Sequence, residues 1–311
     1  MNYKKFVSCG NIMLDTVEHD NGARTEIHIG GPSMFALAGI RLYTKECGLV
    51  CQGGSDHVDK YRDWMRANRL GCDYIRVSAD HCTQHVLRHH TDGTYEWKSR
   101  YGQQLMGYLK TTPEHIDAAT DDTTEGIYLA QNTDKVFWGK LNEVKRKKNF
   151  KIMWELELPH PDDGIAEDKL KRVMDVVPFA DMWSLNVVEA SYLFDIPRDD
   201  EHSIIKRIMD MPVELTLFRV GKKGAYAVTP SDAVFCESID ITASVDPTGC
   251  GNNSTGAAMY AHVSGHSPKE VVVMANIAAG YNAAQLGPYP KYSDEDMQNA
   301  LRLLKECSTK I

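Results

Sequence analysis

The chain has 311 residues, of which 42% are hydrophobic and 25% are charged, and its formal net charge is −8. This composition is typical of a soluble globular protein, and the length suffices for one sizeable α/β domain. The acidic net charge argues against nucleic acid as a partner. No apolar run reaches the ~20 residues of a membrane span, and none forms the core of a signal peptide. We therefore expect a cytoplasmic protein with no membrane partner.

Apolar, β-branched segments alternate with helical patterns along most of the chain. This alternation predicts βα units and a mainly parallel sheet that is covered by helices on both faces. Segment 83–110 departs from it, because two extended runs flank a turn at 91–94 without a helix of their own. The expected strands are 5–14, 48–52, 126–131, 151–156, 181–185 and 214–220, and the expected helices include 57–69, 271–285 behind a capping box at 267–270, and one opened by Ser293.

Two pairs of residues near the expected strand ends have both a functional and a structural interpretation. Asn186 and Glu189 follow a buried strand with i, i+3 spacing, which places both side chains on one side of a helix start. A helix cap with Asn186 as N-cap and Glu189 as its capping-box partner explains the same pair. Gly221 and Gly224 let the backbone pass close to a ligand, and a plain β-hairpin turn explains them as well.

The most informative segment is 245–256. Gly249 and Gly251 have no Cβ, so their backbone can approach an anion closely, and a run of small residues behind them predicts a helix. The start of that helix directs free N–H groups and the positive end of its dipole at the anion. The alternative is a glycine-rich turn before a tightly packed helix, because a short glycine motif alone is weakly specific.

Taken together in their order along the chain, these motifs resemble those of the ribokinase-like (PfkB) family of sugar and nucleoside kinases. The resemblance extends over nearly the whole chain. Segment 246–252 resembles the signature Asp-Thr-x-Gly-Ala-Gly-Asp, whose final Asp takes the proton from the acceptor hydroxyl, and Asn252 stands at that position. The resemblance implies a three-layer α/β fold in a single domain, 1–311, with a small β-sheet lid formed by about 16–29 and 83–110. It further implies ATP and Mg²⁺ as cofactors, a sugar or nucleoside as substrate, and a homodimer through the lid.

The resemblance also assigns roles to residues by their position in the motifs. Phe35 stands where an Asn contacts the sugar in ribokinases, which argues against a ribose-specific site. The implied catalytic residues are Gly249, Cys250, Gly251 and Asn252; the substrate-binding residues are Asp15, Gly30 and Gly31; the nucleotide-binding residues are Asn186, Gly221, Gly224, Asp246 and Asn276; and Glu189 organises the metal through water.

Asn252 raises a question of function, because an amide cannot accept a proton at neutral pH and a carboxylate base contributes about 10² to 10⁴-fold. Three explanations stay open. Another carboxylate takes over, with Glu155, Glu157 and Glu189 as candidates; or the chain binds a sugar, nucleoside or nucleotide without transferring phosphate; or the site runs another reaction, such as glycosidic hydrolysis with Asp15 and one of these glutamates. The fold alone does not decide among them.

Overall fold

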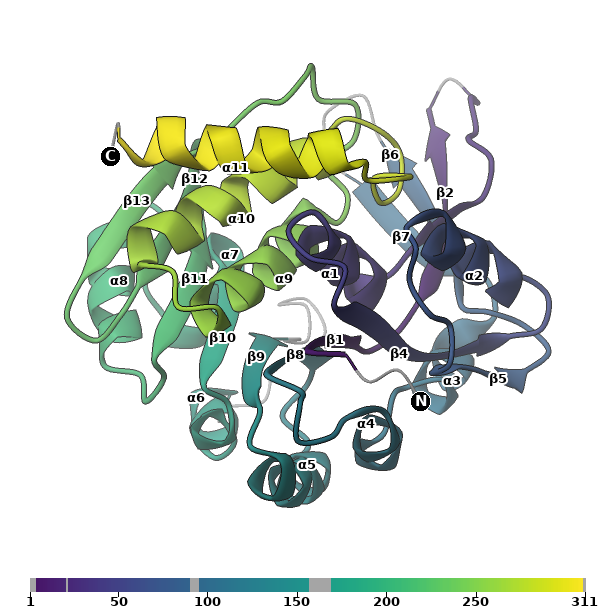
Figure 1. Ribbon diagram of the computed structural model, residues 1–311, viewed down its shortest axis with the longest axis horizontal. Helices are drawn as coiled ribbons and strands as arrows, with labels where there is room; N and C mark the ends of the chain where they lie inside the picture. Colours follow the sequence, from purple (N-terminus) through teal and green to yellow (C-terminus); the bar gives the residue numbers. More distant parts are fainter. Residues whose placement is uncertain (1–3, 21, 90–94, 157–168, 310–311) are drawn as a thin grey trace.

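A computed structural model describes residues 4–20, 22–89, 95–156 and 169–309 (Figure 1). The strands of the large sheet are β1 (Phe6–Cys9), β4 (Cys47–Gly54), β5 (Ile75–Ala79), β8 (Gly126–Gln131), β9 (Lys151–Leu156), β10 (Met182–Asn186), β11 (Leu215–Arg219), β12 (Gly224–Val228) and β13 (Ala233–Glu237). Within the described ranges, they form a nine-stranded sheet in the order β13-β12-β11-β10-β9-β8-β1-β4-β5. The strands from β11 to β5 pair in parallel, and β12 and β13 add an antiparallel edge.

Helices cover both faces of this sheet and bury two separate apolar clusters (Figure 1). One face carries α1 (Pro32–Arg41), α2 (Val58–Ala67), α9 (Cys250–Val263), α10 (Pro268–Ala283) and α11 (Asp294–Ser308). The other carries α4 (Pro113–Ala119), α5 (Lys135–Lys148), α6 (Lys169–Met174), α7 (Val187–Phe194) and α8 (Glu201–Met209). The predicted three-layer α/β architecture with a mainly parallel central sheet is therefore confirmed.

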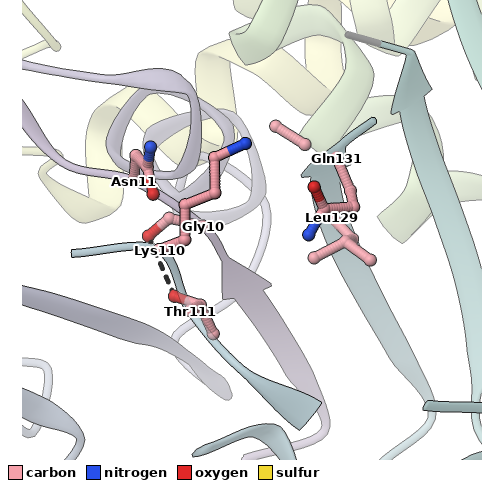
Figure 2. Close-up of a pocket in the computed structure, with 7 residues that line it drawn as sticks. Gly10, Asn11, Lys110, Thr111, Leu129 and Gln131 are labelled. Atoms are coloured by element: carbon pink, nitrogen blue, oxygen red, sulfur yellow. Dashed lines mark hydrogen bonds between the residues drawn. The ribbon is translucent and has the colours of Figure 1, made fainter. Parts of the chain in front are cut away.

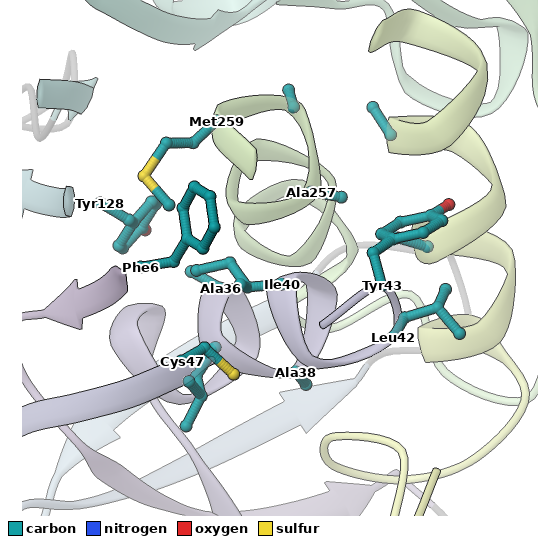
Figure 3. Packing of buried hydrophobic residues seen from close by; sticks show 14 of the residues in the cluster. Phe6, Ala36, Ala38, Ile40, Leu42, Tyr43, Cys47, Tyr128, Ala257 and Met259 are labelled. Atoms are coloured by element: carbon teal, nitrogen blue, oxygen red, sulfur yellow. The ribbon is translucent and has the colours of Figure 1, made fainter. Parts of the chain in front are cut away.

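Alternation along the central strands decides which side chains meet which helix layer. On β8, Ile127 and Leu129 join the cluster under α5, whereas Tyr128 joins the cluster under α1 and α9. Figure 3 shows Tyr128 beside Phe6 and Met259 in the cluster under α1 and α9. Each fully buried side chain of this size contributes about 1.5–3 kcal/mol to folding. The same packing brings the Tyr128 hydroxyl to the start of α9.

A second, small sheet lies beside the large one (Figure 1). Its strands are β2 (Met13–His19), β3 (His28–Gly30), β6 (Gln84–His89) and β7 (Tyr95–Ser99), in the order β3-β2-β6-β7. The predicted hairpin forms, since β6 and β7 pair antiparallel. Its turn lies outside the described residues. That this sheet closes over a ligand, that the chain is one domain, and that a homodimer forms through the sheet stay predictions.

Two expectations for these segments were wrong. The strand expected over 5–14 is two strands, because Gly10 has φ 144° and turns the chain between β1 and β2. Segment 83–110 is also not extended throughout, since α3 (Gly102–Tyr108) follows β7. The run Gln103–Met106 consists of good helix formers, which explains this helix. None of the helices in the described ranges combines the length and the apolar character needed to cross a membrane.

Candidate functional site

The predicted anion-binding segment forms the start of α9. Gly249 is the N-cap in the left-handed region at φ 77°, and a Cβ there would overlap the ring of Phe35. Cys250, Gly251 and Asn252 form the first turn. The Cys250 N–H donates to the Pro247 carbonyl oxygen at 3.1 Å, whereas the N–H groups of Gly251 and Asn252 have no carbonyl partner within the helix. The positive end of the helix dipole adds to these donors. The geometry therefore suits an anion.

A cavity of about 420 Å³ opens at this helix start. This volume lies in the range of small-molecule sites. It brings together six residues that the sequence predicted for the nucleotide and catalytic roles: Asn186, Gly221, Gly224, Cys250, Gly251 and Asn276. Asn276 also holds α10 to β13, because its side-chain amide donates to the carbonyl oxygens of Cys236 and Glu237 at 2.8 and 2.9 Å. The residues thus fit a nucleotide.

A much smaller pocket, about 10 Å³, lies on the other side of the segment 246–249. Asp246 and Thr248 line this small pocket, whereas Pro247 and Cys250 line the large cavity. The segment therefore lies between the large cavity and the small pocket. The small pocket is further lined by Asp15, Val17, His28, Ile29, Phe35, Leu87, Leu286 and Gly287.

Asp15 is the acidic group that the small sheet brings to this pocket. Burial, and secondarily the charge of Asp246, raise the pKa of Asp15 to about 7. His85 lies with Nδ1 4.0 Å from Asp15 Oδ1, but burial lowers the pKa of His85 and disfavours its charged form. Gly30 lies against Asp15, since a Cβ on Gly30 would overlap the carboxylate, and Gly31 is the N-cap of α1. The three predicted substrate residues are therefore neighbours.

A hydrogen-bonded chain leads from Asn252 into the sheet. Asn252 Nδ2 donates to the Tyr128 hydroxyl at 3.2 Å, and this hydroxyl donates to Glu155 Oε2 at 2.7 Å. Glu155 Oε1 lies 2.9 Å from Arg219 Nη2. Burial and the neighbouring Glu155 keep the pKa of Tyr128 well above its usual value, so the phenol stays protonated.

Glu189 is engaged by groups of the protein itself. Asn186 and Glu189 form the expected capping box of α7, and the Asn186 N–H donates to Glu189 Oε2 at 2.6 Å. Arg219 Nη2 lies 3.7 Å from the same oxygen. Burial raises the pKa of Glu189, while Arg219 and this N–H counter the rise. These contacts occupy Glu189 Oε2, and a contact of Glu189 with a metal ion through water stays a prediction.

The metal question extends beyond Glu189. Across the ranges that the structure describes, no group of three or more His, Cys, Asp or Glu side chains could hold a metal ion. Asp246 Oδ1 accepts from the Thr248 N–H at 3.0 Å and from its hydroxyl at 2.8 Å. The carboxylate is thus used in part to shape the segment before α9.

Figure 2 shows another small cavity, where the carboxyl ends of β1 and β8 meet. It measures about 10 Å³ and is lined in part by Asn11, Lys110 and Gln131. The Thr111 hydroxyl lies 3.2 Å from the Gly10 carbonyl oxygen and 3.1 Å from that of Val50. A space of this size holds about one water molecule, so this cavity adds no ligand site.

Tyr128 and Arg219 were not predicted as site residues. A polar hydroxyl inside the apolar run of β8 was the available signal for Tyr128. For Arg219, the signal was a cation at a strand end, two residues before Gly221. Glu155 was a candidate base and is part of the chain to Asn252. Glu157 lies outside the described residues.

Comparisons with known proteins agree with this architecture. The model of the family described as pfkB family carbohydrate kinase matches residues 6–294. A Schizosaccharomyces pombe protein described as uncharacterised is 25% identical over an alignment of 322 positions. The alignment covers 91% of this chain and 85% of that protein. The structure of adenosine kinase from Sinorhizobium meliloti superposes with a TM-score of 0.76 at 16% identity, covering 97% of this chain and 99% of that one. Arabidopsis thaliana ribokinase complexed with ribose and ATP gives 0.73 at 17% identity, with 97% and 99% covered. The predicted ribokinase-like fold is confirmed.

Proposed function

This chain belongs to the pfkB family of carbohydrate kinases, and we propose that it transfers the γ-phosphate of ATP to a hydroxyl group of a small sugar or nucleoside. The observation that carries this proposal is the position of segment 246–252. It separates a nucleotide-sized cavity from the pocket that contains Asp15, and it offers helix N–H groups between them. The family match does not favour a binding protein without phosphoryl transfer or a glycoside hydrolase.

The nucleotide enters the large cavity with its phosphates toward the start of α9. Gly221 and Gly224 border the cavity at the β11–β12 turn, and Gly280 borders it on α10, so the base and ribose lie between these elements. Arabidopsis ribokinase, a structure of the same fold, is complexed with ATP. The first-turn N–H groups then face the transferring phosphoryl group, where donors contribute most to the rate.

The acceptor hydroxyl comes from the small pocket. Asp15 accepts hydrogen bonds from acceptor hydroxyl groups, and Phe35 offers an aromatic face beside Gly249. At about 10 Å³ the pocket is too small for a sugar, so the small sheet moves away for entry and closes afterwards. Adenosine kinase shares this fold, and a sugar or a nucleoside are both substrates to test.

Glu155 is the terminal base in this proposal, and Tyr128 connects it to the acceptor. As the acceptor oxygen bonds to the γ-phosphorus, the bond from phosphorus to the β-phosphate oxygen breaks and ADP leaves. The acceptor proton passes to the Tyr128 oxygen while the Tyr128 proton passes to Glu155, which lies 2.7 Å away. Asn252 orients the acceptor through its amide. Positioning and electrostatics supply the larger share of the barrier reduction.

A ligand panel tests the proposal. Thermal shift with adenine nucleotides, sugars and nucleosides identifies binders, since any ligand of the native state raises its melting temperature. Each binder is then incubated with ATP, and release of ADP is measured. Hydrogen exchange with a bound acceptor should show added protection in β2, β3, β6 and β7. Binding of nucleotide and acceptor without any ADP release above background would contradict the kinase proposal.

A further inference from the structure

Arg219 lies at the end of β11 with its side chain only 14% exposed. Its Nη2 nitrogen is 2.9 Å from Glu155 Oε1 and 3.7 Å from Glu189 Oε2. Burial disfavours the charge, but the attraction of Glu155 and Glu189 outweighs it and keeps the pKa of Arg219 above its ordinary value. Two carboxylates thus hold a permanent cation in one orientation.

The rest of this guanidinium is directed at the helix start. A Cβ on Gly251 would overlap Arg219 Nη1, so this nitrogen lies directly against the backbone that offers its N–H groups. Both residues line the 420 Å³ cavity. Arg219 Nε is buried and has no hydrogen-bond partner in the part of the chain that the structure describes. The carboxylates engage Nη2, and Nη1 is the guanidinium nitrogen that lies at the helix start, whereas the buried Nε does not reach the cavity.

We propose that Arg219 is the cation of the phosphate site, so that a nucleoside diphosphate binds to this chain without a divalent metal ion. This inference rests on the proposed function in one respect, namely that a nucleotide occupies the large cavity. A guanidinium presents a planar set of donors that matches two phosphate oxygens. Together with the N–H groups of Gly251 and Asn252, it neutralises charge on the terminal phosphate.

The surroundings of Arg219 also oppose a metal ion at this place. Glu189 is the residue that the family resemblance assigns to the metal, and its carboxylate already accepts from the Asn186 N–H and pairs with Arg219. A divalent cation beside Glu189 would lie close to the guanidinium, and like charges repel strongly in a partly buried site. The built-in cation and a metal ion therefore compete for the same position.

Calorimetric titration with ADP tests this proposal in two buffers, one with Mg²⁺ and one with EDTA. We expect the dissociation constants for the native chain to agree within about threefold. Arg219→Thr should weaken ADP binding in EDTA by about ten- to hundredfold, the effect of one hydrogen bond to a charged group. The matched control is Arg66→Thr, since Arg66 pairs with Asp63 at 2.8 Å on the exposed face of α2. This control should leave ADP affinity unchanged.

Arg219→Lys provides a second variant, because it keeps the charge opposite Glu155 and Glu189 when Arg219→Thr fails to fold. We expect Arg219→Lys to bind ADP in EDTA more weakly than the native chain, since a lysine lacks the planar fork. ADP binding by the native chain that requires Mg²⁺ would overturn the inference and leave the proposed function standing. Unchanged ADP affinity in EDTA for the folded Arg219 variants would also overturn the inference and leave the proposed function standing. Absence of ADP binding in both buffers would overturn the inference and the proposed function together.

Discussion

The side-chain amide of Asn252 donates a hydrogen bond to the hydroxyl of Tyr128, with 3.2 Å between the two atoms. Because Tyr128 gives its single proton to Glu155, the hydroxyl can only accept from Asn252. The amide is thereby oriented with Nδ2 toward the sheet. Asn252 is in this sense a positioning residue.

Restoring a carboxylate at this position should increase phosphoryl transfer. Asn252→Asp places a proton acceptor at the start of α9 next to the acceptor hydroxyl, and we expect a gain in turnover of roughly 10² or more. Release of ADP from the purified variant, with each sugar or nucleoside that binds, is the measurement. Asn252→Ala is the comparator and should show no gain. Turnover at background for Asn252→Asp with every binder would refute this expectation.

Removing the Tyr128 hydroxyl should reduce both stability and turnover. Tyr128→Phe deletes one hydrogen bond to the amide of Asn252 and one to the carboxylate of Glu155, so the free energy of unfolding should fall by about 1–3 kcal/mol. If Glu155 receives the proton through Tyr128, kcat also falls while ADP affinity stays constant. Urea unfolding and steady-state kinetics measure these effects.

Tyr192→Phe is the matched control for Tyr128→Phe. The Tyr192 hydroxyl is buried and has no hydrogen-bond partner among the described residues. Its removal should leave turnover unchanged and should not lower the free energy of unfolding, because no hydrogen bond to a described residue is lost. Equal losses of stability and turnover in the two variants would mean that the chain from Asn252 to Glu155 has no special role.

A methyl group at Gly251 should disturb the phosphate site. The Cβ of Gly251→Ala would overlap Arg219 Nη1 and displace the guanidinium from the helix start. We expect ADP affinity, measured by calorimetry, to fall by about tenfold. Gly139→Ala is the control, since no atom lies within 4 Å of a Cβ placed there on α5. This control should stabilise the helix by about 0.5–1 kcal/mol and leave ADP binding unchanged.

Asp15 should make stability depend on pH. Its folded-state pKa of about 7 lies above the ordinary value of 3.8, so between these pH values the folded protein holds a proton that the unfolded chain has lost. The free energy of unfolding should therefore fall as pH rises through this window, by up to about 1.4 kcal/mol per pH unit from this group, and level off at higher pH. Urea unfolding from about pH 5 to about pH 8 measures the slope.

Two substitutions isolate the contribution of Asp15. Asp15→Asn cannot ionise, so its unfolding free energy should lose this part of the pH dependence. Asp59→Asn is the control, because the Asp59 side chain is 74% exposed on α2. It should keep the slope of the native chain. Parallel pH profiles for the native chain and Asp15→Asn would show that Asp15 does not titrate in this window.

The sequence alone predicted the central strands and the glycine-rich start of the helix behind segment 245–249. Strands 126–131 and 151–156 have the predicted bounds, because strands buried on both faces are continuous apolar runs. The predicted capping box at Ser267 formed, and Ser293 opens the last helix as predicted. These features depend on residues a few positions apart, so one segment contains the information for each of them.

The tertiary structure decided which side chains meet in the site. Tyr128 and Glu155 are diagonal neighbours, because the register of β8 with β9 pairs Tyr128 with Met153 and Ala130 with Glu155. Arg219 reaches Glu155 across the intervening strand β10. Asn252 contacts a residue 124 positions earlier, because α9 packs over β8. Such contacts depend on strand order, register and helix packing together, and no local pattern in the sequence specifies these three.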